Sequence, residues 1–328
     1  MKGAASQVRR AVKRLLLGSA SVHQYIPIGL RDPQSEVSVW LHGLGAARDV
    51  TYSNVVASTR PLTLGIGLEK HLDFAAVRRT KPSLEFREKD GGSLLGEIDL
   101  RPTESILLED GQLCLFEPQH CKNHCLGKPW LWTRYLYFAY GQRRSRKRSQ
   151  APGFQIPAGH LHCLFVFYIC PRPVVLVSVA DASLATIVPM DLIGPVSARC
   201  FSLALHSTST AAPLIERSRR IALSGVPPEH AAVAYQLGRN HEAPCVDMDH
   251  LPFATTRSAA FGLPVPRFAL RVREMKIESV RTVGGYRLFL ASAVEDRRLA
   301  DRPQFFLVHG FYRRLAASSE LSLAHLRS

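Results

Sequence analysis

The sequence predicts a mainly β protein, a barrel or sandwich with a few short helices. Three observations carry this prediction. Short runs of alternating apolar and polar residues recur along the chain, and turn residues separate them. β-branched and aromatic residues are concentrated in these runs, as suits a pleated surface. Only two segments carry the start and stop signals of helices, and both are short.

In the N-terminal half, residues 37–42 alternate as a strand does. Residues 84–88 and 94–100 flank a turn of Lys89, Asp90, Gly91 and Gly92, whose glycines tolerate the positive φ angles of a tight hairpin. Residues 130–140, rich in Trp and Tyr, are predicted as a further strand.

The C-terminal half repeats this pattern around two helices. The helices are predicted over 211–220, whose basic end complements the helix dipole, and over 229–239, which follows two prolines. The predicted strands are 161–170, 173–181, 199–207, 268–280, 286–294 and 304–312.

A chain of 328 residues favours two domains. The densest charge run, Arg143 to Arg148, would repel itself inside a packed element, so it is predicted to be an exposed linker. The expected division is a β-rich domain over 1–142, a linker over 143–153, a second domain over 154–318 and a tail over 319–328.

The net charge of +15 raises the alternative of a nucleic-acid-associated β protein. The basic run contains no stacking aromatics, which argues against that role. Seven cysteines and no convincing secretory signal favour a cytoplasmic protein without a disulfide framework. No apolar stretch approaches the ~20 residues that a membrane span requires, so no membrane partner is expected.

The segment His120 to Cys125, with the sequence HCKNHC, concentrates four candidate zinc ligands. Zinc sites usually take pairs of ligands from two separated loops, so this spacing favours a structural loop and no metal site. His160 and His162 alternate before an apolar run, which would place both on one face of a strand as structural residues.

Five pieces of the C-terminal half follow one another in a particular order. They are the strand PVVLVSV, the segment ATIVPMDLIGPV, the strand FSLALHS, the segment TSTAAPLIERSRRIAL, and the late strands that close with LVHGFYRRL. In order and spacing this block resembles the flavin reductase-like FMN-binding split-barrel family. The fold class implied by the resemblance is therefore an FMN-binding split barrel.

The resemblance implies two groups of FMN contacts. The loop after the first strand would cradle the ring and ribityl chain with Thr186, Ile187, Val188, Pro189, Met190 and Asp191. The hydroxyl row, which we define as Ser207, Thr208, Ser209 and Thr210, would hold the phosphate; hydroxyl groups beside a helix N-terminus suit an anion in any case. His309, in the closing segment, is a further candidate contact. Taken alone, the row would be no more than a helix cap.

The N-terminal residues 37–69 echo the same plan, with a strand, a polar hairpin, the segment YSNVVAS and then Arg60 and Pro61 before a strand. Members of the family are usually homodimers with flavins between barrels, so a degenerate second barrel in tandem would act as an internal partner, a pseudo-dimer. Asn54, Ser58 and Arg60 would then face one flavin. The alternative is an unrelated β-rich domain in which these side chains cap turns.

The function implied by the resemblance is an FMN-dependent oxidoreductase of the NAD(P)H:flavin reductase type, whose partners are flavin, nicotinamide and an unidentified electron acceptor. The flavin performs the hydride chemistry, so no catalytic side chain is expected. A non-catalytic flavin-binding module stays open, because the segment ASLATI lacks the glycine and asparagine common in the family. No G-x-G-x-x-G turn is present to distinguish NADH from NADPH.

Overall fold

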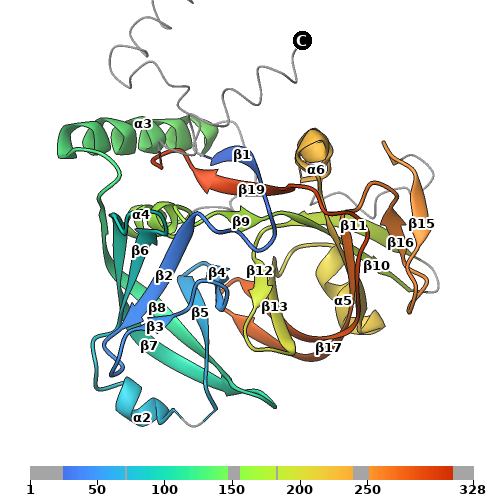
Figure 1. Ribbon diagram of the computed structural model, residues 1–328, viewed down its shortest axis with the longest axis horizontal. Helices are drawn as coiled ribbons and strands as arrows, with labels where there is room; N and C mark the ends of the chain where they lie inside the picture. The colour runs from blue at the N-terminus through green and yellow to red at the C-terminus, as the bar shows by residue number, and fades with distance from the viewer. Residues whose placement is uncertain (1–24, 71, 147–155, 182–183, 239–250, 313–328) are drawn as a thin grey trace, which may run out of the picture.

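The computed structural model describes residues 25–312, with the exception of residues 71, 147–155, 182–183 and 239–250. Two seven-stranded antiparallel sheets, each strongly curled, lie side by side (Figure 1). Helices are few, and most are short. The prediction of a mainly β fold with a few short helices is confirmed, and its sheets are curled like half-barrels.

The first sheet has the strand order β3-β2-β6-β7-β8-β5-β4. Its strands are β2 (Val37–His42), β3 (Arg48–Asp49), β4 (Asn54–Thr59), β5 (Leu62–Leu68), β6 (Ser83–Glu88), β7 (Leu94–Leu107) and β8 (Gln112–Asn123). The hairpin between β6 and β7 turns where predicted, and Gly91 and Gly92 adopt φ angles of 93° and 66°. Most other residues would be strained there.

The second sheet has the order β11-β10-β14-β17-β18-β13-β12. Its strands are β10 (Val175–Ala180), β11 (Ala185–Met190), β12 (Ile193–Pro195), β13 (Cys200–His206), β14 (Arg220–Gly225), β17 (Arg271–Val283) and β18 (Tyr286–Arg298). These strands confirm the predictions for 173–181, 199–207, 268–280 and 286–294.

The two large sheets share one strand order. If the seven strands of each sheet are numbered along the chain, both sheets read second, first, fifth, sixth, seventh, fourth, third across their width. A short helix also follows the fourth strand of each sheet: α2 (Phe74–Val77) in the first and α5 (Ala211–Ser218) in the second.

Two smaller sheets complete the described strands. One has the order β1-β19-β9 and joins β1 (Tyr25–Leu30), β19 (Gln304–His309) and β9 (Arg172–Pro173). The other pairs β15 (Thr255–Arg257) with β16 (Pro264–Pro266). The three-stranded sheet lies above both large sheets in Figure 1 and connects the beginning of the described chain to its end.

Both predicted helices of the C-terminal half are present. The first is α5, and the second is a 3₁₀ turn, η2 (Pro228–His230), that continues as α6 (Ala231–Gly238). Helix α5 buries Ala211, Ala212, Leu214 and Ile215, a spacing that suits one helical face.

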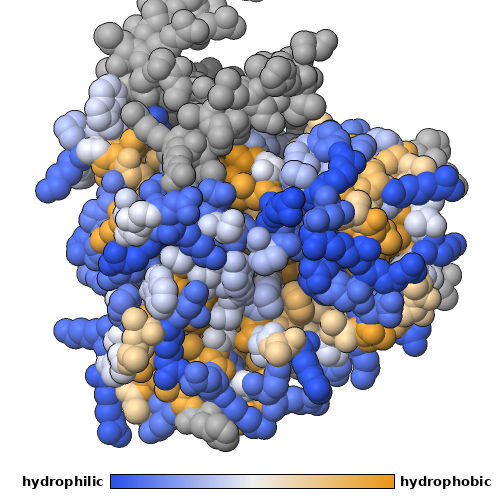
Figure 2. Space-filling view, in the orientation of Figure 1, coloured by the Kyte–Doolittle hydropathy of each residue, from blue (hydrophilic) through white to orange (hydrophobic). Residues whose placement is uncertain are grey.

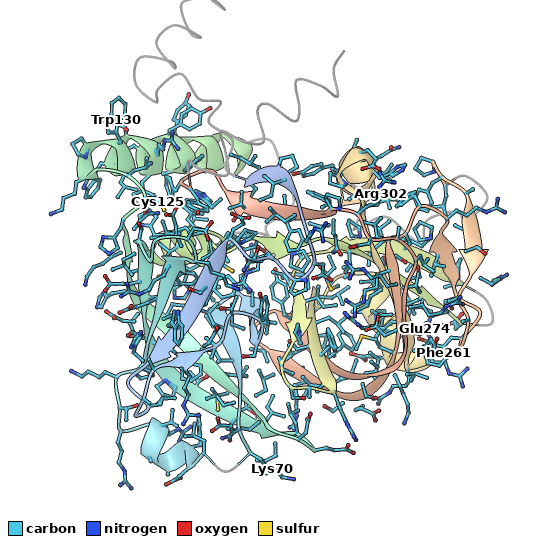
Figure 3. The ribbon with its side chains drawn as sticks, in the orientation of Figure 1. Lys70, Cys125, Trp130, Phe261, Glu274 and Arg302 are labelled. Carbon is cyan, nitrogen blue, oxygen red and sulfur yellow. The ribbon has the colours of Figure 1, made fainter. Side chains whose placement is uncertain are left out.

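The strand predicted over 130–140 is wrong, because these residues lie in helix α3 (Lys128–Arg146). Leu131, Arg134 and Phe138 are buried, whereas Trp132 and Leu136 are exposed, which is a helical spacing. Trp130 projects outward from the same helix in Figure 3. The helix also takes in the start of the basic run as far as Arg146, a segment predicted to be a linker; residues 147–155 lie outside the described residues.

The strand predicted over 161–170 is also wrong, because α4 (Ala158–Phe167) occupies most of it. This helix packs against β7 and β8 and also contacts residues of α3, so Leu161 and all residues from Cys163 to Phe167 are buried. A helix that is apolar all round shows no sequence periodicity. His160 and His162 therefore do not share a strand face.

Hydrophilic side chains cover much of the face seen in Figure 2, and apolar groups show between them in separate patches. Among the residues that the structure describes, no helix is long and apolar enough to cross a membrane.

Candidate functional site

The hydroxyl row lies at the end of β13, where the chain turns into α5. Ser207 and Thr208 are exposed, and Ser209 and Thr210 are half-buried. The Ser209 Oγ accepts a hydrogen bond from the Ala211 N–H, at 3.4 Å. Ser209 therefore contacts the first N–H of the helix, whereas the N-cap residue Thr210 forms no side-chain cap bond.

The first two hydroxyl groups of the row have partners within the protein. The N–H and the hydroxyl of Ser207 both donate to the Gly285 carbonyl, each at 2.9 Å. The Thr208 hydroxyl lies 2.6 Å from His206 Nδ1, which also accepts the Thr208 N–H at 3.3 Å. A ring nitrogen that accepts an N–H carries no proton, so the Thr208 hydroxyl donates to it as well. The hydroxyl protons of Ser207 and Thr208 are therefore both engaged within the protein.

Arg60, which directly follows β4 of the first sheet, contacts the neighbourhood of the hydroxyl row. Its carbonyl oxygen accepts a hydrogen bond of 2.8 Å from the Gly285 N–H, in the turn that also receives Ser207. A Cβ atom on Gly284 would lie 2.0 Å from the same carbonyl, so glycine is required for this approach. Burial lowers the pKa of Arg60, although the nearby Tyr286 acts in the opposite direction. The structure therefore places Arg60 beside the hydroxyl row.

The Ser58 and Thr59 side chains lie on the same edge. The Arg60 N–H donates to Ser58 Oγ at 2.9 Å, and the Thr59 hydroxyl lies 2.7 Å from the Tyr286 hydroxyl of the second sheet. Ser58 thus holds the backbone of Arg60 in place, as its interpretation as a turn cap requires.

Of the residues predicted to cradle the flavin ring, Thr186 to Met190 lie in strand β11 and Asp191 directly follows it, so the prediction of a loop is wrong. Thr186 pairs with Val179 on β10, and Ile187, Val188 and Met190 are buried. Val188 and Met190 share a hydrophobic cluster with α5, so the strand and the helix that follows the hydroxyl row pack against one core.

Pro189, Met190 and Asp191 line a cavity of 380 Å³ together with Tyr235 and Phe305; the hydroxyl row is not among its lining residues. The Tyr168 hydroxyl donates to Asp191 at 2.7 Å. Burial raises the pKa of this carboxyl group, against the lowering effect of the bond from Tyr168.

Asn54 lies at the opposite end of β4 from Arg60. Its side-chain nitrogen donates to the carbonyls of Val50 and Thr51, at 2.5 and 3.1 Å. Its two oxygens accept hydrogen bonds from the guanidinium of Arg172. Nη1 donates to the Asn54 main-chain carbonyl, at 3.0 Å, and Nη2 donates to the Asn54 side-chain oxygen. Asn54 therefore belongs to a different site from the hydroxyl row.

That second site is a cavity of 270 Å³ between the two large sheets. Residues from both halves line it, including Tyr52, Asn54, Arg172, Phe201 and Gln304. Arg172 and Gln304 were not among the residues predicted from the sequence. One signal in the sequence could have indicated this site, because Arg172 is a lone charge within the apolar residues 161–179.

The HCKNHC segment is not the predicted loop, because His120 to Asn123 form the end of β8. Cys121 lies near Cys163 of α4, and His124, which follows the strand, lies 2.8 Å from Glu97. Among the described residues, no group of three His, Cys, Asp or Glu side chains could hold a metal ion.

The remaining histidines of interest have packing partners. His160 Nδ1 accepts from the Leu62 N–H at 3.1 Å, and His162 stacks on Tyr135 at 3.8 Å between ring centroids. His309 is fully buried, and its ring lies against Phe165, with 4.3 Å between the centroids.

Comparison with known proteins adds independent information. Residues 167–315 match the family model described as the flavin reductase like domain. Comparison with curated proteins gives no match.

Several solved structures are similar to about half of the chain. An FMN-binding protein from Thermus thermophilus is 22% identical, with a TM-score of 0.40, over 49% of this chain and 88% of that one. The NADH:FAD oxidoreductase SgcE6 of Streptomyces globisporus C-1027 is 16% identical, with a TM-score of 0.42, over 50% and 96%. The styrene monooxygenase flavin reductase of Pseudomonas putida S12 is 16% identical, with a TM-score of 0.38, over 46% and 93%.

The matched residues run from the end of α4 through the whole second sheet to the closing segment after β19. They include every segment on which the sequence resemblance was based. The C-terminal half of the chain, residues 167–315, is a flavin reductase-like domain.

Proposed function

We propose that the protein is an FMN-dependent oxidoreductase that takes hydride from NADH or NADPH and passes electrons to a separate acceptor in the cytoplasm. The observation that carries the proposal is the match of residues 167–315 to the flavin reductase like domain. When bound, FMN supplies the hydride chemistry itself, so the protein needs only to bind, orient and shield it.

The hydroxyl row is the proposed phosphate site. Thr208 is its exposed threonine, whose hydroxyl would turn from His206 Nδ1 to the ligand, and the first turn of α5 adds the partial positive charge of a helix N-terminus. Arg60 lies across the same glycine turn and adds a full positive charge from the other half of the molecule. A doubly charged anion is favoured by this combination.

We further propose that the N-terminal half is a degenerate second barrel, so that the chain forms a pseudo-dimer. The shared strand order of the two large sheets supports this proposal, and so does the contact of β4 with β12, β13 and β18. The Arg60 carbonyl docks on the turn between β17 and β18, and the Arg199 N–H donates to Asp110 in the turn between β7 and β8. Each half thus contacts the hairpin formed by the last two strands of the other half's sheet, β7–β8 or β17–β18.

The first experiment is reconstitution of the full chain with FMN, followed by absorbance and by quenching of flavin fluorescence. Saturable binding is expected, and its absence would contradict the proposal. The double substitution Thr208→Val and Thr210→Val removes two hydroxyl groups with little change in volume. It should weaken FMN binding roughly tenfold or more, because each lost hydrogen bond to a charged group costs ~1.5–3 kcal/mol.

Thr133→Val, on α3, is the matched control and should leave FMN affinity unchanged, because the Thr133 hydroxyl bonds only to the Trp130 carbonyl within its own helix. Bleaching of the bound flavin by NADH or NADPH under anaerobic conditions then distinguishes an enzyme from a flavin-binding module. Flavin that binds but is not bleached by either nucleotide would support the module.

A further inference from the structure

The cavity between the two large sheets has apolar walls and a few polar groups. Ile193, Phe201, Leu223 and Phe306 contribute apolar side chains to its 270 Å³. Small-molecule sites usually have this composition, with a small number of polar groups that fix the ligand's orientation.

Arg172 is the buried charge of this cavity. Its side chain is 7% exposed, its guanidinium carbon lies 3.9 Å from the centre of the Phe167 ring, and its Nη atoms donate to Asn54. The Nε atom is buried and has no hydrogen-bond partner. No carboxylate oxygen of the described residues lies within 4.0 Å of the guanidinium.

A buried cation without an anion is costly, because its hydration is lost and not replaced. Burial lowers the pKa of Arg172, although the charge of Asp191, whose carboxylate lies beyond 4.0 Å, acts in the opposite direction. Asn54 supplies only neutral oxygens. An anionic ligand in the adjoining cavity would add the direct counter-charge that the protein does not.

Gln304 is a second polar group without a partner. It is 4% exposed and lines the cavity, and none of the described residues forms a hydrogen bond with its side-chain amide. Buried amide groups are nearly always hydrogen-bonded in folded proteins. An amide nitrogen turned toward the cavity suits a ligand oxygen.

The remaining charged side chains of the cavity also favour an anion. Arg271 and Arg273 line the cavity, and both form ion pairs with Asp296, which does not line it. Asp32 is the one acidic lining residue and lies 3.4 Å from Arg271. Three guanidinium groups thus line the cavity with one carboxylate, because Asp296 and Asp191, which partly neutralise them, do not line it. Positive charge lies nearer to the cavity than most of the negative charge, and this arrangement favours an anion.

We propose that this cavity binds a small organic carboxylate with a flat apolar body, recognised by Arg172 and Gln304. The apolar walls hold the body of the ligand, and the guanidinium and amide hold its carboxylate. The site is separate from the hydroxyl row and does not depend on flavin binding, so it goes beyond the proposed function.

The test uses the full chain and titrates it with benzoate and with benzamide, its neutral analogue of the same shape, by isothermal calorimetry. Saturable binding of benzoate is expected, at least roughly tenfold tighter than that of benzamide, because a charge-assisted bond contributes ~1.5–3 kcal/mol. No saturable benzoate binding, or equal binding of the two compounds, would overturn the proposal.

Two variants locate the site. Gln304→Leu should weaken benzoate binding roughly tenfold, by loss of one hydrogen bond to a charged group. Val175→Trp should abolish it, because Val175 lines the cavity and is only partly buried, so the larger ring can enter the space. Val294→Trp, at an exposed position on β18, is the matched control and should bind benzoate normally.

Thermal unfolding of each variant, measured in parallel, shows that it is folded. Unchanged benzoate affinity in both Gln304→Leu and Val175→Trp would place the ligand elsewhere and refute the proposed site. FMN affinity, measured in the same variants, should not change. Loss of FMN binding in these variants would contradict the separation of the two sites. A wild-type chain that binds benzoate but not FMN would refute the proposed function alone.

Discussion

The Arg172 guanidinium donates to both oxygens of Asn54 and thereby joins the first residue of β4 to the first residue of β9. Both residues are buried, and 118 positions separate them in the chain. The contact fixes one half of the molecule against the other at the cavity.

Replacement of Asn54 should therefore destabilise the whole protein. Asn54→Ala leaves Arg172 Nη2 without its side-chain acceptor in a buried site, which should lower the free energy of unfolding by about 2–3 kcal/mol. Urea denaturation measures the change. Asn123→Ala is the control, because only one bond, from the Cys125 N–H, is lost there. An equal loss in both variants would contradict the role given to Asn54.

Glu274 should be sensitive to the loss of its charge. Its carboxylate is 1% exposed and accepts bonds from the Ser258 hydroxyl and from the N–H groups of Ala260 and Phe261, at 2.6 to 2.7 Å. Figure 3 shows Glu274 and Phe261 side by side. Glu274→Gln should cost about 2 kcal/mol, because an amide NH₂ would face donors. Glu278→Gln, at an exposed position on the same strand, should change stability by less than ~0.5 kcal/mol in the same urea titration.

Asp296 should contribute to acid unfolding. Burial acts to raise its pKa, but the bonds and charges of Arg271 and Arg273 outweigh burial, and the pKa is lowered. Its stabilising effect is thus complete above the unfolded-state pKa of about 4 and is lost as the pH falls through the lower folded-state pKa. The advantage of the wild type over Asp296→Asn should shrink as the pH falls from about 5 to 2. A constant difference between the wild type and Asp296→Asn over this pH range would disprove the assignment.

His309 should remain neutral in the folded state. Burial, with the positive charge of Arg134 nearby, lowers its pKa well below the ordinary value. The unfolded chain takes up a proton below about pH 6.5 and the folded chain does not, so stability should fall as the pH drops below that value, by at most about 1.4 kcal/mol per pH unit. His309→Phe should remove this part of the slope. An NMR titration in which the His309 ring protonates near pH 6.5 would show the prediction to be mistaken.

The sequence was sufficient to predict the strands that are buried on one face and the helices with an apolar stripe. The alternation of residues 37–42, the glycine turn at 91–92 and the buried spacing of α5 are local signals, and the structure has each of them. Helices α3 and α4 could not be distinguished from strands by the same means. Aromatic residues in α3 suggested a sheet, and α4 is apolar on every side because both α3 and the first sheet cover it.

The candidate sites were predictable only in part. The hydroxyl row is contiguous in sequence, so its residues could be named, and the nearness of Arg60 follows from packing between the two halves. The cavity at Arg172 has no local signature, because β4, β9, β12 and β19 approach it from distant parts of the chain. Interactions of this kind depend on tertiary structure, which local patterns do not encode.

The pairing of β1 with β19 has a consequence for synthesis. Ile26 and Ile28 from the beginning of the described chain, and Phe306 and Val308 from its end, belong to the same hydrophobic core as the first sheet. When only about the first 150 residues have been synthesised, the core of the first sheet still lacks the side chains of β19. We therefore expect the N-terminal half to complete its folding only after this last strand has been made.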